Sequence, residues 1–193
     1  MSAQHIALFE TAIGVCGIAW SERGIAGVQL PEASAQATRA RLLRRFPGAE
    51  EATPPASARR AIDGIVALLA GNPVDLSAIE LDDAGVPPFE RRVYAVARSI
   101  GPGATLTYGE VAARVEDPTA AREVGQALGS NPFAIIVPCH RVLAAGGRIG
   151  GFSAGGGAAT KRRILAIERA RVGDAPDLFA DEPRLHPPAG SDT

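Results

Sequence analysis

The chain has 193 residues, of which 46% are hydrophobic and 21% are charged, and its net charge is −1. This composition suits one globular domain, or two small ones, with a mainly aliphatic core. Its two cysteines exclude a disulfide framework, and no Cys/His cluster has zinc-ligand spacing. No secretory signal or membrane-spanning stretch is recognisable. We therefore expect a cytoplasmic protein that needs no metal or cofactor and does not enter a membrane.

Charge divides the chain into three parts. Residues 88–170 hold 11 Lys and Arg against 6 Asp and Glu, whereas residues 1–87 and 171–193 each carry a net charge of −3. A basic block between acidic flanks is compatible with a nucleic-acid partner, although the overall charge argues against one. We expect residues 1–87 and 88–170 to form two domains and residues 171–193, which are acidic and rich in proline, to form a mobile tail.

The first part predicts a mixed α/β domain. Residues 6–30 contain apolar runs separated by a turn at "SERG", which indicates short strands. Residues 33–46 and 58–71 have the apolar periodicity of helices, and the second of these ends at a glycine. Residues 74–81 are expected to form a further strand. The fold class is therefore α/β (α+β), with a small β-rich domain packed on a mainly helical one.

The second part predicts consecutive helices. Residues 89–100 carry one apolar stripe, and "TYGEVAARV" begins with a capping box in which Thr107 and Glu110 bond reciprocally. The next helix is expected to use Asp117 as its cap and Pro118 as its first residue. Two short helices joined by a tight turn make a helix-turn-helix candidate, although most such pairs bind no DNA.

The second helix of this pair has an unusual face. Ala121, Gly125 and Gly129 recur every four residues and leave a strip almost without side chains. This strip could pack closely against another helix, or it could approach a nucleic-acid groove with Arg122 beside it.

Cys139 is the candidate reactive group. It lies between Pro138 and His140, after an apolar segment, residues 133–137, that we expect to form a buried strand. A lone cysteine in such a place is usually an inert buried thiol. A reactive one needs a neighbouring base or cation, because the thiolate is the nucleophile. His140 could supply this directly only if the backbone turns, because adjacent side chains of an extended chain point to opposite sides. The residues alone also leave open a Cys/His hydrolase.

Several motifs in a fixed order resemble one known family. "REVGQALGSNP" and "PCHRV", within a match that runs from "PFERRVYAVARSIGPGATLTYGEVA" to "KRRILAIE", resemble the O6-alkylguanine-DNA alkyltransferases, also called methylated-DNA–protein-cysteine methyltransferases. The match covers roughly 80 residues, while the amino-terminal half matches only loosely. Phe152 departs from the pattern, since the family often has tyrosine there, and Glu123 stands where a small residue is common.

The resemblance implies a role for each matching residue. Cys139 would accept the alkyl group, and His140, through a water, and Glu168 would leave it as a thiolate. Tyr108 would give a proton to the departing guanine, and Asn131 would hold the turn before the cysteine. The remaining residues would bind DNA (Arg122 in the base stack, Ala121 and Gly125 in the minor groove) or the extruded base (Val142, Phe152, Ser153, Lys161).

The activity implied by the resemblance is DNA repair in a single turnover. The partner would be double-stranded DNA that carries O6-alkylguanine, with O4-alkylthymine as a second candidate substrate, and the base would be flipped out to reach a monomeric protein. The thioether product would be permanent, so each molecule would act once as a suicide enzyme. The alternative is a module that binds alkyl lesions without transferring the group and recruits other repair proteins.

Overall fold

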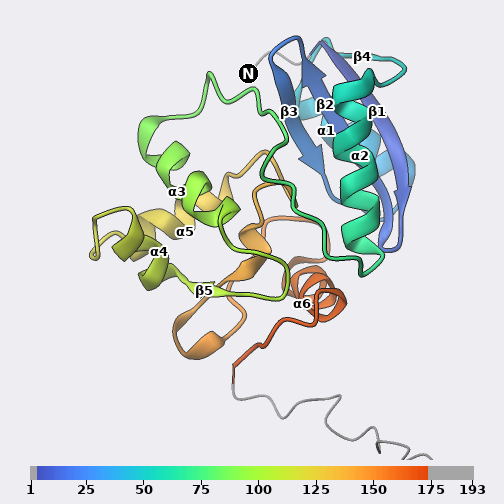
Figure 1. Cartoon of the computed structure of the whole chain (residues 1–193). Coiled ribbons are helices and arrows are strands. Elements are labelled where there is room, and N and C mark those ends of the chain that lie inside the picture. The colour runs from blue at the N-terminus through green and yellow to red at the C-terminus, as the bar shows by residue number, and fades with distance from the viewer. Residues whose placement is uncertain (1–3, 174–193) are drawn as a thin grey trace, which may run out of the picture.

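The computed structural model describes residues 4–173, which form a sheet flanked by helices and, beside it, a mainly helical part (Figure 1). This arrangement confirms the expected fold class. The division at residues 87 and 88 stays a prediction. The predicted mobile tail, residues 171–193, lies outside the described residues from residue 174 onward.

The amino-terminal sheet has four strands in the order β3-β2-β1-β4. Strands β1 (His5–Thr11), β2 (Gly14–Ser21) and β3 (Gly24–Gln29) are antiparallel neighbours, and the short β4 (Glu50–Glu51) runs parallel to β1. The strands and the turn predicted within residues 6–30 are thereby confirmed.

Helices cover both faces of this sheet, with α2 standing in front of it in Figure 1. Helix α1 (Ala35–Arg45) packs on one face through Leu42, and α2 (Ala56–Leu69) packs on the other through Ile65. Because both faces are buried, β2 and β3 are almost continuously apolar instead of alternating. Both helices match their predicted ranges within a few residues.

The carboxy-terminal half supplies the remaining elements. They are α3 (Pro88–Arg98), β5 (Leu106–Thr107), α4 (Tyr108–Arg114), α5 (Ala121–Gly129), the 3-10 turn η1 (Cys139–Arg141), β6 (Val142–Leu143), the 3-10 turn η2 (Ala145–Gly147) and α6 (Gly157–Ile167). Strands β5 and β6 pair in parallel. Three isoleucines of this half, Ile135, Ile136 and Ile164, are buried in the same hydrophobic cluster as α2 and the sheet, so the two halves share a core.

The predicted cap of α4 is confirmed, but the predicted start of α5 is wrong. Thr107 accepts a hydrogen bond from the backbone of Glu110, and the Glu110 carboxylate accepts one in return from the backbone of Thr107. Helix α5 begins at Ala121 without a side-chain cap, because residues 118–120 form a turn closed by a hydrogen bond from Ala120 to the Asp117 carbonyl. The Asp117 carboxylate instead accepts a hydrogen bond from the Thr119 hydroxyl.

The strand predicted at residues 74–81 is also wrong. Only Leu81 makes a bridge to the sheet, opposite Ile25. The guanidinium of Arg98 donates to the carbonyls of residues 76, 77 and 79, so a side chain from α3 occupies the acceptors that a neighbouring strand would have used. The apolar pattern of residues 74–81 therefore reflects packing against the core and not pairing with a neighbouring strand.

The turn between α4 and α5 contains a strained residue that can be improved. Glu116 has a φ of 64° where the helix ends, and the amide of Asp117 bonds back to the Ala112 carbonyl, which is a Schellman motif. A side chain in this left-handed conformation costs roughly 1–2 kcal/mol relative to glycine. We predict that Glu116→Gly raises the free energy of unfolding by about 1 kcal/mol in chemical denaturation. Ala113→Gly, at an exposed position one turn earlier in α4, should lower the free energy of unfolding by a similar amount. A lower free energy of unfolding in both variants would contradict this account.

Neither a membrane span nor a metal cluster is found in the described part of the chain. No helix of residues 4–173 combines the length and the apolar character needed to cross a bilayer. Over the same residues, no three His, Cys, Asp or Glu side chains are grouped so that they could hold a metal ion.

Candidate active site

The segment before Cys139 is a tight turn and not the buried strand that the apolar pattern predicted. The amide of Val137 donates to the Phe133 carbonyl over 2.8 Å, and Ile135 has a φ of 72°. Asn131 fixes the turn from inside: its Nδ2 donates to the Val137 carbonyl (2.8 Å), while its Oδ1 accepts from the Phe133 amide (2.9 Å). A β-branched residue at positive φ is strained and persists only where the surroundings enforce it. Asn131 therefore holds the turn before Cys139 in place through these two hydrogen bonds.

Cys139 itself begins the 3-10 turn η1, so the chain is not extended at this point. The Arg141 amide donates to the Pro138 carbonyl over 2.9 Å and closes the turn. In this turn, neighbouring side chains do not point to opposite sides as they would in an extended segment. Cys139 is 9% exposed, whereas His140 is fully buried. Cys139 is therefore the most exposed residue of this turn.

Glu168 lies at the end of α6 and binds both residues that follow the cysteine. Its Oε1 is 3.0 Å from His140 Nε2 and 2.7 Å from Arg141 Nη2, and its Oε2 accepts from Arg141 Nε over 2.9 Å. Burial alone raises the pKa of this carboxyl, but the hydrogen bonds from His140 and Arg141 and the charge of Arg141 overcome it and lower the pKa to about 2. Glu168 is therefore a carboxylate at neutral pH.

This carboxylate sets the proton arrangement on His140. Burial lowers the pKa of the imidazole, more than the hydrogen bond and charge of Glu168 raise it, so His140 is neutral. A neutral imidazole facing a carboxylate carries its proton on the facing nitrogen, here Nε2. The other nitrogen, Nδ1, is then a free acceptor, and it is buried without a hydrogen-bond partner within residues 4–173. His140 is thus ready to receive a proton.

The cysteine is protonated in this state. Burial raises the pKa of the Cys139 thiol, against the hydrogen bond from Asn131 and the positive charge of Lys161, which lower it. The resemblance to the alkyltransferases implies a thiolate, whereas burial favours the neutral thiol in this structure. The thiol therefore has to lose its proton for the sulfur to act as a nucleophile.

Two aromatic rings and a buried ammonium group lie near Cys139. Lys161 is fully buried and donates to the Val142 carbonyl over 2.6 Å. Its Nζ lies 5.8 Å from the ring centroid of Tyr108 and 6.0 Å from that of Phe152. Burial and the nearby Cys139 raise the pKa of the Tyr108 phenol, so this hydroxyl keeps its proton. The Val142 carbonyl therefore accepts one hydrogen bond from Lys161, and its predicted contact with an extruded base stays a prediction.

A cavity of about 220 Å3 opens beside the sulfur. Its lining combines the two halves of the chain. From the carboxy-terminal half come Asn131, Cys139, Phe152 and Ser153, and from the amino-terminal half come Val28, Gln29, Leu30, Arg41 and Arg45. The cysteine is therefore not sealed off, and four of the predicted site residues surround one cavity.

The predicted DNA-contacting residues lie on the exposed side of α5. Arg122 is exposed, and Ala121 and Gly125 are partly exposed. A Cβ on Gly125 would lie 3.9 Å from the Tyr108 ring, which is an ordinary contact, and one on Gly129 would meet nothing within 4 Å. Close packing therefore does not require glycine at either position.

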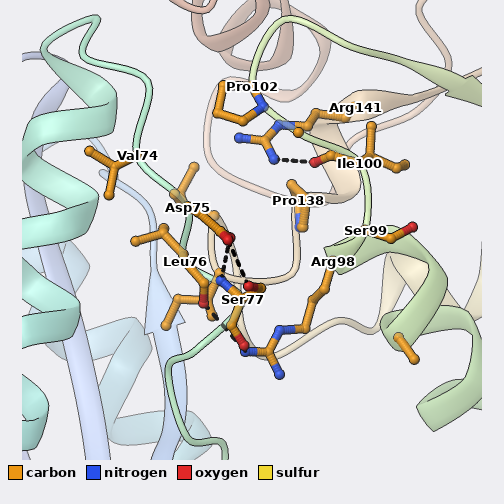
Figure 2. A pocket seen from close by; sticks show the side chains of 14 residues that line it. Val74, Asp75, Leu76, Ser77, Arg98, Ser99, Ile100, Pro102, Pro138 and Arg141 are labelled. Carbon is orange, nitrogen blue, oxygen red and sulfur yellow. Dashed lines mark hydrogen bonds between the residues drawn. The ribbon is translucent and has the colours of Figure 1, made fainter.

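A larger cavity, of about 640 Å3, lies on the other side of η1. Figure 2 shows Asp75, Ser77 and Arg98 on its walls, with Arg141 reaching toward Ile100. Cys139 does not line this cavity, and Arg141 there donates to the Ile100 carbonyl. Despite its size, this cavity therefore does not reach the candidate nucleophile.

Arg141 is the site residue that sequence reasoning missed. It is 5% exposed and holds Glu168 with two hydrogen bonds, so it fixes the carboxylate against His140. The available signal was its place directly after His140, together with Glu168, which is the one acid in the segment "KRRILAIERA". A buried arginine almost always pairs with a carboxylate.

The chain is similar to known proteins in sequence and in fold. Residues 88–170 match the family model described as 6-O-methylguanine DNA methyltransferase, DNA binding domain. A methylated-DNA–protein-cysteine methyltransferase from Methanothermobacter thermautotrophicus is 34% identical over 152 residues, which cover 79% of this chain and 78% of that protein. The protein of that name from Mycobacterium tuberculosis is 44% identical over 112 residues, which cover 58% of this chain and 66% of that protein.

Solved structures agree with these relatives. The crystal structure of Mycobacterium tuberculosis OGT in complex with DNA superposes with a TM-score of 0.69 at 33% identity, over 88% of this chain and 96% of that one. The likeness therefore extends through both halves of the fold and beyond the cysteine motif. The chain belongs to the methylated-DNA–protein-cysteine methyltransferase family.

Proposed function

We propose that this protein repairs O6-alkylguanine in double-stranded DNA by moving the alkyl group irreversibly to Cys139. The observation that carries the proposal is the cavity lined by Cys139. The neutral acceptor His140 follows Cys139 in the same 3-10 turn, and the protonated Tyr108 packs against the same hydrophobic cluster as Cys139. The base and the acid are each in the protonation state that the reaction needs, and the thiol gives up its proton as the sulfur reacts.

The transfer is a single displacement. The sulfur attacks the alkyl carbon, the S–C bond forms as the C–O6 bond breaks, and the guanine departs with the electron pair. The thiol proton passes through a water to His140 Nδ1, and Glu168 stabilises the imidazolium that forms. Tyr108 donates a proton to the guanine, so that it leaves as a neutral base. The product thioether does not hydrolyse at neutral pH, so the protein acts once.

The helix pair α4–α5 would present the protein to DNA as a helix-turn-helix. The alkyl group on O6 of guanine cannot be reached while the base is stacked inside DNA, so the base must be extruded at a cost of a few kcal/mol. The exposed Arg122 would fill the gap in the base stack, with Ala121 and Gly125 in the minor groove. Phosphate contacts from the net positive charge of residues 88–170 would offset the cost without reading sequence.

The stoichiometry of repair tests this proposal. DNA that carries O6-methylguanine, in excess over the protein, should lose methyl groups until their number equals the number of protein molecules. Continued loss beyond that point would indicate a hydrolase. Stable binding of the lesion without any loss would favour the alternative, a module that only binds alkyl lesions.

The Tyr108 hydroxyl gives a separate prediction. Tyr108→Phe keeps the ring and removes the acid, so we expect the single-turnover transfer rate at saturating DNA to fall about a hundredfold, in the usual range for general acid catalysis. The matched control is Tyr94→Phe, because the chain has two tyrosines and Tyr94 is buried with its hydroxyl bonded to the Ala127 carbonyl. The control should lower stability and leave transfer unchanged. Equal transfer rates in the two variants would remove Tyr108 from the mechanism.

A further inference from the structure

The loop that closes the cysteine cavity is held by the amino-terminal half of the chain. This pocket loop, residues 150–156, carries Phe152 and Ser153, both of which line the cavity with Cys139. Four of its seven residues are glycine, so the free loop has many conformations to lose when it is ordered. A contact that fixes the loop therefore determines the shape of the cavity wall.

Arg41, on α1, makes that contact. Its Nη2 donates to the Ser153 carbonyl over 3.2 Å, and its Nε lies 3.3 Å from Glu32 Oε1. Glu32 is itself held, because Gln29 Nε2 donates to the same Oε1 over 3.2 Å. The planar guanidinium can satisfy a carbonyl and a carboxylate in fixed directions at once, which a lysine ammonium cannot do.

A second contact joins the same two segments. A Cβ on Gly155 would lie 2.6 Å from the Pro31 carbonyl oxygen and 3.0 Å from Glu32 Oε2, so the loop backbone passes directly against residues 31 and 32. The position is therefore restricted to glycine by space. Two independent contacts thus bind the pocket loop to the amino-terminal half.

We propose that Arg41 is a positioning residue that latches the pocket loop over Cys139, so that the amino-terminal half sets the geometry of alkyl transfer. This inference rests on the proposed function. The reacting carbon must lie in line with the sulfur, and a misplacement of about 1 Å can cost on the order of a hundredfold in rate. A loosened loop would still admit DNA but would hold the base less well.

The test compares Arg41→Gln with Arg44→Gln. Arg44 is exposed in the last turn of the same helix, and no hydrogen bond or ion pair involves it within residues 4–173. We expect Arg41→Gln to speed hydrogen–deuterium exchange of the pocket loop and to slow transfer at saturating DNA about tenfold. Both variants should weaken DNA binding equally, since each loses one cation, and Arg41→Lys should recover part of the rate.

A glycine pair tests the latch from the loop side. Gly155→Ala should reproduce the faster exchange and slower transfer, whereas Gly101→Ala, which lies outside the pocket loop and whose Cβ would meet nothing within 4 Å, should change neither. Equal loop exchange in Arg41→Gln and Arg44→Gln would overturn the proposal, as would weaker DNA binding with an unchanged transfer rate. The exchange comparison decides the latch even if the wild-type protein removes no methyl group, a result that would contradict the proposed function alone.

Discussion

Replacing Cys139 with serine is expected to abolish alkyl transfer while the protein still folds and binds alkylated DNA. Serine is close to cysteine in size, so the 3-10 turn and the cavity should persist. Its hydroxyl is a far weaker nucleophile at neutral pH, and burial opposes the formation of an alkoxide as it opposes the thiolate. Single-turnover assays with DNA that carries O6-methylguanine should therefore show no loss of the methyl group.

Cys16→Ser is the matched control for this variant. Cys16 is fully buried in β2, and burial raises the pKa of its thiol to about 12, so it has no means of reacting. The control should transfer normally and unfold more easily, because it puts a hydroxyl into the hydrophobic core. Transfer that survives in Cys139→Ser and disappears in Cys16→Ser would reverse the assignment.

Glu168→Gln should have the second-largest effect, because it removes the charge that organises the relay. The carboxylate is 1% exposed and pairs with Arg141, which is itself almost buried. Removing one partner of a buried ion pair leaves the other charge unpaired and typically costs about 3–5 kcal/mol. Without the carboxylate, the imidazolium formed when His140 takes the cysteine proton is not stabilised, so transfer should slow about a hundredfold.

Denaturation and single-turnover assays check both parts of this prediction. Glu22→Gln, which changes an exposed glutamate in the turn between β2 and β3, is the control and should leave stability and transfer unchanged. Wild-type transfer in a stable Glu168→Gln variant would show that the relay is not needed.

The Glu168 carboxyl also makes the difference in unfolding free energy between wild type and Glu168→Gln depend on pH in a defined direction. Its pKa is about 2 in the folded protein and ordinarily 4.5, so the unfolded state binds the proton more readily. The stabilisation by Glu168 is thus fully present above about pH 4.5 and is lost as the pH falls toward 2. The difference in unfolding free energy between wild type and Glu168→Gln should narrow over that interval. A difference that stays constant there would contradict the low pKa.

Local patterns were predictable because their causes lie within a few residues. The capping box needs only Thr107 and Glu110, and the strands of residues 6–30 follow from apolar runs separated by glycine turns. The positions of Cys139, His140 and Glu168 around one centre followed from the resemblance to a family. Spacing alone did not supply them.

Two of the errors share one cause, which is that distant side chains fix the backbone. Arg98 binds the carbonyls of residues 76, 77 and 79 and replaces the expected strand. The hydrogen bonds of Asn131 and the packing of Ile135 in the amino-terminal core fold residues 133–137 into a turn. The apolar composition of this segment alone predicts a strand. The contact between Arg41 and Ser153 spans 112 residues of sequence, and no periodicity reports it. Tertiary contacts therefore decided what local propensity could not.

The most direct test of the account is to locate the transferred group by peptide mass spectrometry after reaction with DNA that carries O6-methylguanine. The chain offers two free thiols, Cys16 and Cys139. We predict one methyl group on the peptide that contains Cys139 and an unchanged peptide for Cys16. A methyl group on Cys16, or demethylated DNA with both cysteines unmodified, would contradict the account.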